Sequence, residues 1–495
     1  MVEESSRIIW YLAVWLIAAA IVVFSQLRKG STWSGLSLAY LLNLWLIHWV
    51  ASAQYALPWY SYYNVEDVIA GLEQSTYAVV AFSAGYLILA YISKRMATPH
   101  VSSAISGVTS GAPGEPAQRN MLLGLSSQQL PGRQAHVAHK KLYVSDAWVT
   151  NLYIGIGAGC FLLSVSELAN FPTVTALITV ASKLSVVGLM LKSWQAWQNG
   201  RKKAFWLWLS FSSAYPVLTI VTQGFIGYGI FNTIIVFSFV SIFYRPRWKL
   251  VVLGLAAVYL GLSLFVTYMR DRSAIRGTVW GGESYGSRFD QLKETMRNAE
   301  FFDINDDEHL ERVDQRLNQN ALVGASVNYI ESGGQEFACG ETFWEAIIAM
   351  IPRVLWPDKS VVAGSGDLVA KYTGYNFAEG TSVGIGNVME FYVNFGRWGV
   401  IFGFLIFGGV IAWIDKGAGK SLADNDWLTF ACWYLPGIAF LQVGGSFVEV
   451  TASALASLAV AALVKWIVSC VRRYEIGIRY RRLAQFERLP NLERN

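Results

Sequence analysis

The sequence is poor in charged residues. Lys, Arg, Asp and Glu make up 15% of its 495 residues, whereas about a quarter of an average soluble chain is charged. Hydrophobic residues make up 54%, and the mean hydropathy is +0.37. They occur in blocks of about twenty, each long enough to cross roughly 30 Å of hydrocarbon as a helix. This composition excludes a soluble globular protein and predicts an all-α, polytopic membrane protein.

Motifs for metals, nucleotides and hydrolytic triads are also missing. The glycines of AGSGDLVAKYTG (363–374) do not follow a strand that opens a helix, so a nucleotide site is not expected. No zinc-ligand spacing and no Ser-His-Asp arrangement occurs. The four cysteines lie too far apart for a metal-ligand spacing or a disulfide framework: Cys160, Cys339, Cys432 and Cys470. We therefore expect neither a metal nor a cofactor.

The apolar blocks predict about eleven membrane-spanning helices. The first is too long for the core of a signal peptide and is expected to stay as an anchor. The expected spans are 8–27, 33–53, 76–93, 148–169, 172–193, 204–222, 225–244, 249–269, 386–414, 427–446 and 449–470.

Basic residues between these spans predict the topology. With the N-terminus outside, every Lys/Arg cluster falls on the cytoplasmic side, as the positive-inside rule requires. An odd span count also places the basic tail, 471–495, in the cytoplasm, where it could lie on anionic lipid. The clusters are Arg28–Lys29, Lys94–Arg95, Lys140–Lys141, Arg201–Lys203, Arg245–Lys249, Lys416–Lys420 and Arg472–Arg473.

Three segments are expected outside the bilayer. Residues 94–147 are rich in Ser, Gly, Pro and Gln, which is typical of a disordered linker; it separates spans in 1–93 from spans in 148–269. Residues 54–75 form a short aromatic outer loop suited to an interface or to stacking on a sugar. Residues 270–385 form one large outer loop before the closing spans in 386–470.

The large outer loop has two groups of cations at its membrane edges. Arg270, Arg272 and Arg276 follow the eighth span, and Arg353 and Lys359 lie after TFWEAIIAMIP, which predicts a short amphipathic helix on the outer membrane surface. Arg grips phosphate with two parallel hydrogen bonds, and Lys adds a point charge. These residues are therefore candidates for binding a lipid-linked phosphate. The alternative is that arginines at a span end only reach lipid headgroups.

A polar stripe follows in GTSVGIGNVMEFYVNFGRWGV (380–400). On a helix, Asn387, Glu390, Asn394 and Arg397 share one face. A carboxylate there could act as a general base or hold a sugar hydroxyl. Alternatively, Glu390 pairs with Arg397 and has no catalytic role, and an NFG turn at 394–396 would break the shared face.

Other polar residues are candidates for helix pairing as much as for function. They are His48, Glu167, Lys183, Gln442 and Glu449 within the spans. His309 lies in the acidic stretch DINDDEHLE and is expected to be solvated, and the loose spacing of that stretch disfavours a metal site.

Several of these motifs, taken in order, resemble the Wzy-type polymerases of bacterial O-antigen and exopolysaccharide. They are RLNQNALVG (316–324), IPRVLWPDKS (351–360), AGSGDLVAKYTGYNF (363–377) and 380–400, so the resemblance covers roughly residues 265–410. Many spans, one large late outer loop and a few closing spans are similar too. The outer loop departs from the family pattern because it holds about eighteen Asp or Glu against about eleven Lys or Arg.

The resemblance implies a glycosyltransferase at the periplasmic face of the bacterial inner membrane. It would join undecaprenyl-pyrophosphate-linked oligosaccharide repeat units, with a flippase and a chain-length regulator as expected partners and without nucleic acid. Cations would stabilise the departing pyrophosphate, and a base would activate the acceptor hydroxyl. Glu390, Arg353 and Arg270 would be catalytic, with Asp367 or His309 as an alternative base. The substrate-binding residues would be Arg272, Arg276, Arg316, Lys359, Asn394 and Arg397.

Three rival functions stay open. An O-antigen ligase would use the same lipid donor with another acceptor and would rest on an outer-loop histidine. A lipid-linked glycan flippase would carry ionisable residues through several spans, whereas Lys183 is nearly alone near mid-span. A scaffold would need only the outer loop to bind a partner.

Overall fold

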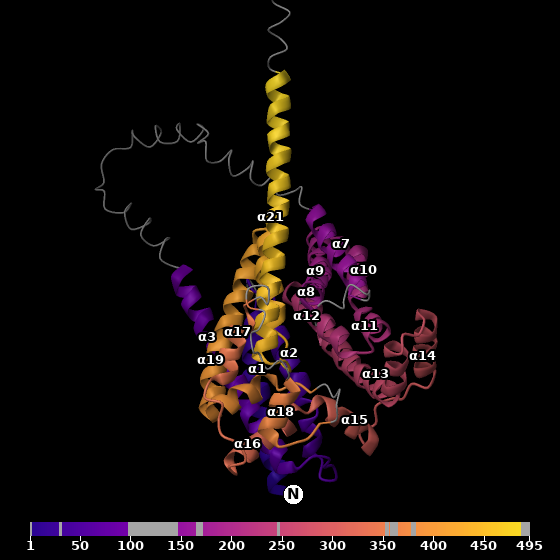
Figure 1. Cartoon of the computed structure of the whole chain (residues 1–495), viewed down its shortest axis with the longest axis vertical. Helices are drawn as coiled ribbons and strands as arrows, with labels where there is room; N and C mark the ends of the chain where they lie inside the picture. The colour runs from indigo at the N-terminus through magenta and orange to yellow at the C-terminus, as the bar shows by residue number, and fades with distance from the viewer. Residues whose placement is uncertain are drawn as a thin grey trace, which may run out of the picture.

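The computed structural model describes residues 2–28, 32–97, 147–164, 172–244, 248–351, 356, 365–377 and 383–486. Within these residues the chain is helical and has no strand. The helices, shown in Figure 1, are α1 (Val2–Leu27), α2 (Leu36–Leu44), the π-helix η1 (Trp45–Trp49), the 3₁₀ helix η2 (Ser52–Ala56), α3 (Val65–Ala97), α7 (Ala147–Leu163), α8 (Pro172–Ser182), α9 (Leu184–Gln198), α10 (Lys202–Ser212), α11 (Tyr215–Gln223), α12 (Gly227–Phe243), α13 (Trp248–Trp280), α14 (Tyr285–Arg297), α15 (Asp307–Leu317), α16 (Gln319–Glu331), α17 (Glu341–Ala349), α18 (Ser365–Thr373), α19 (Gly386–Ala423), α20 (Trp427–Phe440) and α21 (Phe447–Phe486).

Among the described residues, six helical segments are long and apolar enough to cross a membrane: Glu3–Leu27, Val65–Arg95, Thr175–Gln198 (α8 and α9), Lys202–Gln223 (α10 and α11), Gly386–Ala423 and Phe447–Glu475. Four shorter apolar helices lie at Leu36–Trp49, Trp148–Leu163, Gly227–Phe243 and Trp427–Phe440. Each overlaps an expected span, and the eighth expected span, 249–269, lies within α13. The expected loop 54–75 is too long, because α3 already begins at Val65. The all-α prediction is confirmed, and the apolar helices are consistent with a helical membrane protein.

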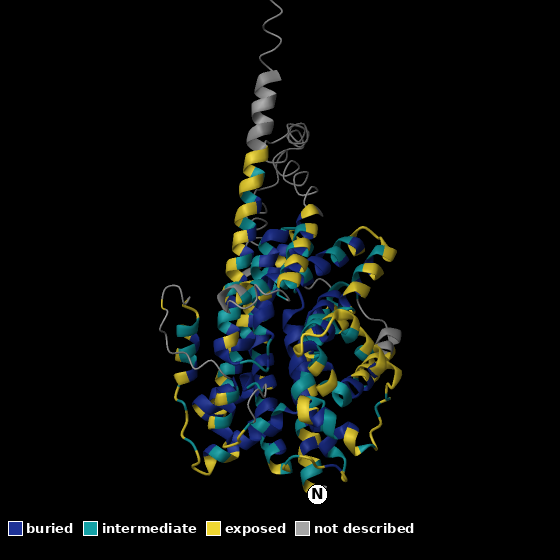
Figure 2. Ribbon diagram, turned by 45° about the vertical axis from the view of Figure 1, so that its right-hand side comes forward, coloured by how far each residue is buried: buried dark blue, intermediate teal, exposed yellow. Residues whose placement is uncertain are grey.

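The helices pack at close crossings around α3. A Cβ at Gly324 of α16 would overlap the Asp67 backbone carbonyl of α3, and a Cβ at Gly408 of α19 would overlap that of Phe82. Small residues at such crossings let two backbones approach closely. Figure 2 shows the buried residues concentrated in this bundle, whereas residues 470–475 of α21 are mostly exposed.

Several expected spans are divided, which corrects the sequence prediction. Residues 33–53 form α2, a π-helical turn and a 3₁₀ turn in succession. The span 172–193 breaks at Lys183, and 204–222 breaks just before Pro216, whose ring occupies the first turn of α11. The helix in 427–446 ends at Phe440. Irregular backbone is tolerated in a membrane where protein buries it, and hydropathy alone does not reveal it.

The segment 270–385, which the sequence predicts as a large outer loop, is mostly helical where it is described. The α13 helix runs past the expected membrane edge to Trp280, and α14 to α18 follow. The short amphipathic helix predicted before Pro352 is present as α17, which buries Thr342 and Ala346 and exposes Trp344 and Ile347. Of the expected linker 94–147, residues 94–97 end α3 and Ala147 begins α7, and the rest lies outside the described residues.

Candidate functional site

Arg270 is held in ion pairs close to its own helix. Its guanidinium donates hydrogen bonds to Asp271 at 2.8 Å and to Glu300 at 2.6 Å, and to the Asn298 carbonyl at 2.7 Å. The hydrogen bonds to Asp271 and Glu300 raise the pKa of Arg270. Arg270 therefore has a structural role in joining α13 to the segment before α15, and its charge is already neutralised.

Three other arginines come together without an acidic partner, and we call Arg272, Arg276 and Arg316 the arginine cluster. Burial and the charges of Arg316 and Arg276 lower the pKa of Arg272 to about 10. Arg316 is exposed to solvent, and the partial burial of its side chain together with the charge of Arg276 lowers its pKa. Among the described residues, none of the three forms an ion pair with a carboxylate. Like charges held together are costly, so the arginine cluster is suited to receive an anion.

Arg276 is supported by aromatic rings. Its guanidinium carbon lies 4.2 Å from the centroid of Phe225 and 5.2 Å from that of Trp280. Its Nε is buried and has no partner among the described residues. Rings that hold a guanidinium by cation–π contact leave its remaining N–H groups free to bind another group.

The aromatic loop before α3 borders the arginine cluster through Tyr63. Burial raises the pKa of Tyr63 to about 12, and the charge of Arg316 opposes this rise. Inside the loop, the hydroxyls of Tyr55 and Tyr60 donate to the buried Asp314 carboxylate at 2.5 and 3.0 Å. Part of the loop is thus core rather than a sugar platform. Trp59 and Tyr62 are exposed, so their rings are accessible for stacking on a sugar.

Glu390 is fully buried, 0% exposed. Its Oε2 accepts a hydrogen bond from the Phe447 backbone N–H at 2.7 Å, and its Oε1 is buried without a partner among the described residues. Phe447 is the first residue of α21, so the carboxylate caps the positive end of that helix. The structure does not present Glu390 at a surface that a substrate could reach.

The polar stripe is broken where the NFG sequence predicts a turn. Phe395 and Gly396 have non-helical backbone angles and kink α19. Asn394, just before the kink, donates to Thr342 at 2.8 Å and accepts from the Gly340 N–H at 2.9 Å, which ties α19 to α17. Arg397, just after it, pairs with Glu73 of α3 at 3.1 Å. Arg397 therefore lies apart from Glu390, and the predicted Glu390–Arg397 pair is wrong.

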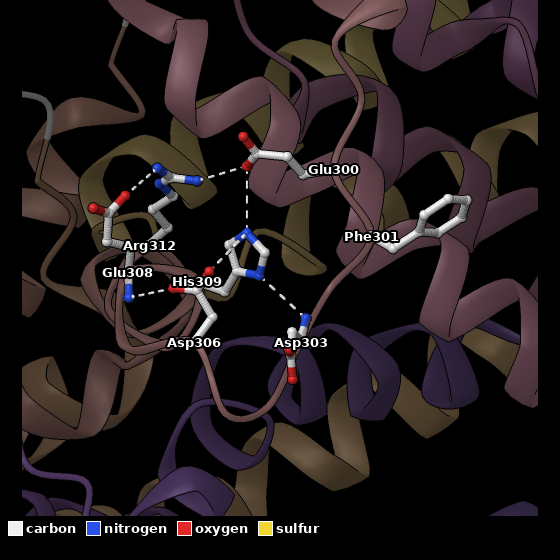
Figure 3. Close-up of a pocket in the computed structure, with 7 residues that line it drawn as sticks. All are labelled: Glu300, Phe301, Asp303, Asp306, Glu308, His309 and Arg312. Atoms are coloured by element: carbon white, nitrogen blue, oxygen red, sulfur yellow. Dashed lines mark hydrogen bonds and ion pairs between the residues drawn. The ribbon is translucent and has the colours of Figure 1, made fainter.

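His309 is buried, which corrects the expectation that it is solvated. It lines a pocket with a volume of about 380 Å³. Figure 3 shows His309 between Glu300, Asp306 and Asp303. Its Nδ1 accepts from the Asp303 N–H at 3.1 Å, and its Nε2 lies 3.3 Å from Glu300 Oε2. Arg312 pairs with the same Glu300 oxygen at 3.1 Å. No group of described His, Cys, Asp or Glu residues could hold a metal ion.

The remaining predicted site residues have no described contact with the arginine cluster. Arg353 and Lys359 lie outside the described residues, and Asp367 is exposed on α18. Of the polar span residues, His48 pairs through Nδ1 with Asn320 at 2.6 Å, and Glu449 accepts from Ser365 at 3.1 Å. Glu167 is outside the described residues.

Two buried carboxylates, Asp314 and Asp415, were not predicted from the sequence. Asp314 lies two residues before Arg316 and positions the aromatic loop. Asp415 accepts five hydrogen bonds, from Gln26, Ser34 and Ser37. The run SGLS at 34–37 is a helix-start signal that could have suggested a carboxylate partner, but the partner's position is 381 residues away for Ser34.

Comparison with known proteins finds a matching family, without a matching curated protein or solved structure. A family model, described as a domain of unknown function (DUF8712), matches residues 127–468, which include the arginine cluster, Glu390 and His309. The chain therefore belongs to the DUF8712 family.

Proposed function

We propose that this protein is a glycosyltransferase that joins lipid-linked oligosaccharide repeat units at the outer face of a bacterial inner membrane. The observation that carries the proposal is the arginine cluster, in which Arg272 and Arg276 from α13 meet Arg316 from α15 with no described carboxylate to neutralise them. Three guanidinium groups supply the positive charge and the N–H donors that a pyrophosphate requires. The motifs that resemble Wzy-type polymerases cover the same part of the chain.

In this proposal the donor is a glycan on undecaprenyl pyrophosphate. The hydroxyl of the acceptor sugar attacks the anomeric carbon of the donor, and the bond to the lipid pyrophosphate breaks. Negative charge develops on the departing pyrophosphate, where the arginine cluster stabilises it. The chemistry uses the lipid as leaving group and needs no nucleotide sugar. Multiple rounds of transfer would lengthen the glycan by one repeat unit at a time.

Glu390 is the proposed general base, and its burial sets a condition on that role. The acceptor hydroxyl can reach Oε1 only if α17 or the turn between α20 and α21 moves aside. Oε2 accepts from the Phe447 N–H, so Oε1 is the oxygen that would take up the proton. If this opening does not occur, Glu390 is only a helix cap, and another group accepts the proton.

The test uses purified protein in nanodiscs with a synthetic undecaprenyl-pyrophosphate-linked repeat unit and no other protein. The proposal predicts a ladder of glycan multiples on a gel. Absence of a ladder, when substrate binding has been confirmed, would contradict it.

A ligase is the second candidate, because His309 is held in a pocket between Glu300 and Arg312. Its Nδ1 is occupied by the Asp303 N–H, so Nε2, which faces Glu300, is the atom available for proton transfer. A ligase would transfer the glycan once, to a different acceptor, and would lose that transfer in a His309→Ala variant. A polymer ladder that survives His309→Ala would exclude this alternative.

A further inference from the structure

A second pocket, of about 380 Å³, lies away from the arginine cluster, between α9, α12, the end of α19 and the residues just before α2. Its walls are mainly aromatic and aliphatic. They include Trp33, Trp194, Phe239, Phe243, Gly419 and Ala423. Its volume falls in the range of about 300–1,000 Å³ that is typical of small-molecule sites.

One polar group in this apolar wall has no partner. The Nε1–H of Trp194 is buried, and no described residue accepts a hydrogen bond from it. A buried N–H group without an acceptor costs free energy, so such groups are rare unless a ligand or water completes them. The occupant that fits is therefore mostly apolar and carries one hydrogen-bond acceptor, as the ester carbonyl of a lipid does.

The surroundings of the pocket are basic. Lys420 follows Gly419 in the wall and is exposed. Arg201, Lys202 and Lys203 are exposed and begin α10, whose Phe205 packs on the pocket residue Phe243 with ring centroids 6.3 Å apart. The nearby carboxylates are Asp415, Asp424 and Asp426. Asp415 is buried and takes its hydrogen bonds from Gln26, Ser34 and Ser37, and Asp426 caps α20 at the Thr429 N–H. The balance of charge favours an anionic headgroup.

We infer that this pocket binds one acyl chain of an anionic phospholipid. The chain enters between the aromatic walls, its ester carbonyl accepts from Trp194 Nε1–H, and its phosphate faces Lys420 and the basic start of α10. The site is independent of the glycosyltransferase proposal, because none of its residues belongs to the arginine cluster or contacts Glu390.

The test is native mass spectrometry of the full chain released from nanodiscs that contain phosphatidylglycerol and phosphatidylcholine in equal amounts. The wild type is expected to retain one phosphatidylglycerol. Ala423→Trp fills the pocket and should abolish retention. Trp194→Phe keeps the ring but removes the N–H, and should weaken retention about fivefold. Ala459→Trp, on an exposed position of α21, is the matched control and should behave as wild type.

Three results would overturn the inference. The first is retention of phosphatidylglycerol by both Ala423→Trp and Trp194→Phe at the wild-type level. The second is equal retention of phosphatidylcholine by the wild type. The third is displacement of phosphatidylglycerol by undecaprenyl phosphate, which would make an isoprenoid the occupant. If Ala423→Trp fails to fold, as judged by its thermal midpoint, Trp194→Phe decides the question alone.

Discussion

The side chain of Glu390 accepts the backbone N–H of Phe447 at 2.7 Å, so one carboxylate joins the kinked α19 to the first residue of α21. The same residue is the proposed base, and these two roles can be separated by a conservative change. A Gln side chain can still accept from the Phe447 N–H through its amide oxygen, but it cannot take up a proton.

We therefore predict that Glu390→Gln folds, with a loss of about 1 kcal/mol or less in the free energy of unfolding, and loses transfer activity by about 100-fold or more. The measurements are the thermal midpoint in detergent and the initial rate of glycan transfer. If Glu390→Gln transfers the glycan at a rate close to wild type, Glu390 is a helix cap only.

Asp415 is predicted to stabilise the fold without contributing to activity. Its carboxylate accepts from Gln26 at the end of α1 and from Ser34 and Ser37 at the start of α2. Asp415→Ala leaves these buried donors unpaired, at a cost of about 3 kcal/mol or more. Thermal unfolding should show a clearly lowered midpoint, whereas Asp424→Ala, at an exposed carboxylate on the same helix end, should leave it within a degree or two. Equal thermal midpoints for Asp415→Ala and Asp424→Ala would contradict the structural role of Asp415.

The close crossing of α16 and α3 predicts that a larger residue at Gly324 destabilises the protein. Gly324→Ala places a methyl group against the Asp67 carbonyl, so the helices must separate, at a cost of about 1–3 kcal/mol. Gly277→Ala in α13 has open space around the new Cβ and should be neutral or stabilising by up to about 1 kcal/mol, because Ala favours a helix. A midpoint for Gly324→Ala equal to that of wild type would mean that the helices do not approach as closely as described.

Ionisation of Asp314 is predicted to make the stability of the fold depend on pH. Burial raises its pKa to about 6, although its hydrogen bonds from Tyr55, Asn318 and Tyr60 oppose the rise. An unfolded Asp titrates near about 3.9, so between about pH 4 and pH 6 the folded state holds more protons and stability falls as the pH rises. Asp314→Asn should reduce the change of the thermal midpoint with pH over this interval. The same slope in both proteins would contradict the burial of an ionisable carboxyl at this position.

Sequence reasoning predicted the apolar helices well, because lengths of about twenty apolar residues depend only on local composition. It missed the breaks at Lys183 and in 45–56, because irregular backbone is stabilised by neighbouring helices that the local pattern does not describe. The kink at Phe395–Gly396 was suggested by the NFG turn, and the structure has it.

The site was predicted only in part, for the same reason. Arg270, Arg272 and Arg276 look equivalent in TYMRDRSAIRG, yet Glu300 neutralises the first and not the other two. That difference depends on how the segment 298–303 folds back onto α13. The meeting of Arg276 with Arg316, forty positions apart in the chain, is likewise a tertiary feature. His309 was expected to be solvated because its neighbours are acidic, but those neighbours instead enclose it.

The most direct test of the account compares Arg316→Ala with Arg297→Ala in the purified polymerisation reaction. Arg297 is an exposed arginine that pairs loosely with Glu294 at 3.9 Å and lies outside the arginine cluster. We predict that Arg316→Ala slows formation of the glycan ladder by about 10²–10³-fold, as is typical when one group that stabilises transition-state charge is removed. Arg297→Ala should stay within about twofold of wild type, and both variants should keep the wild-type thermal midpoint. A ladder formed by Arg316→Ala at the wild-type rate would contradict the assignment of the arginine cluster to the pyrophosphate.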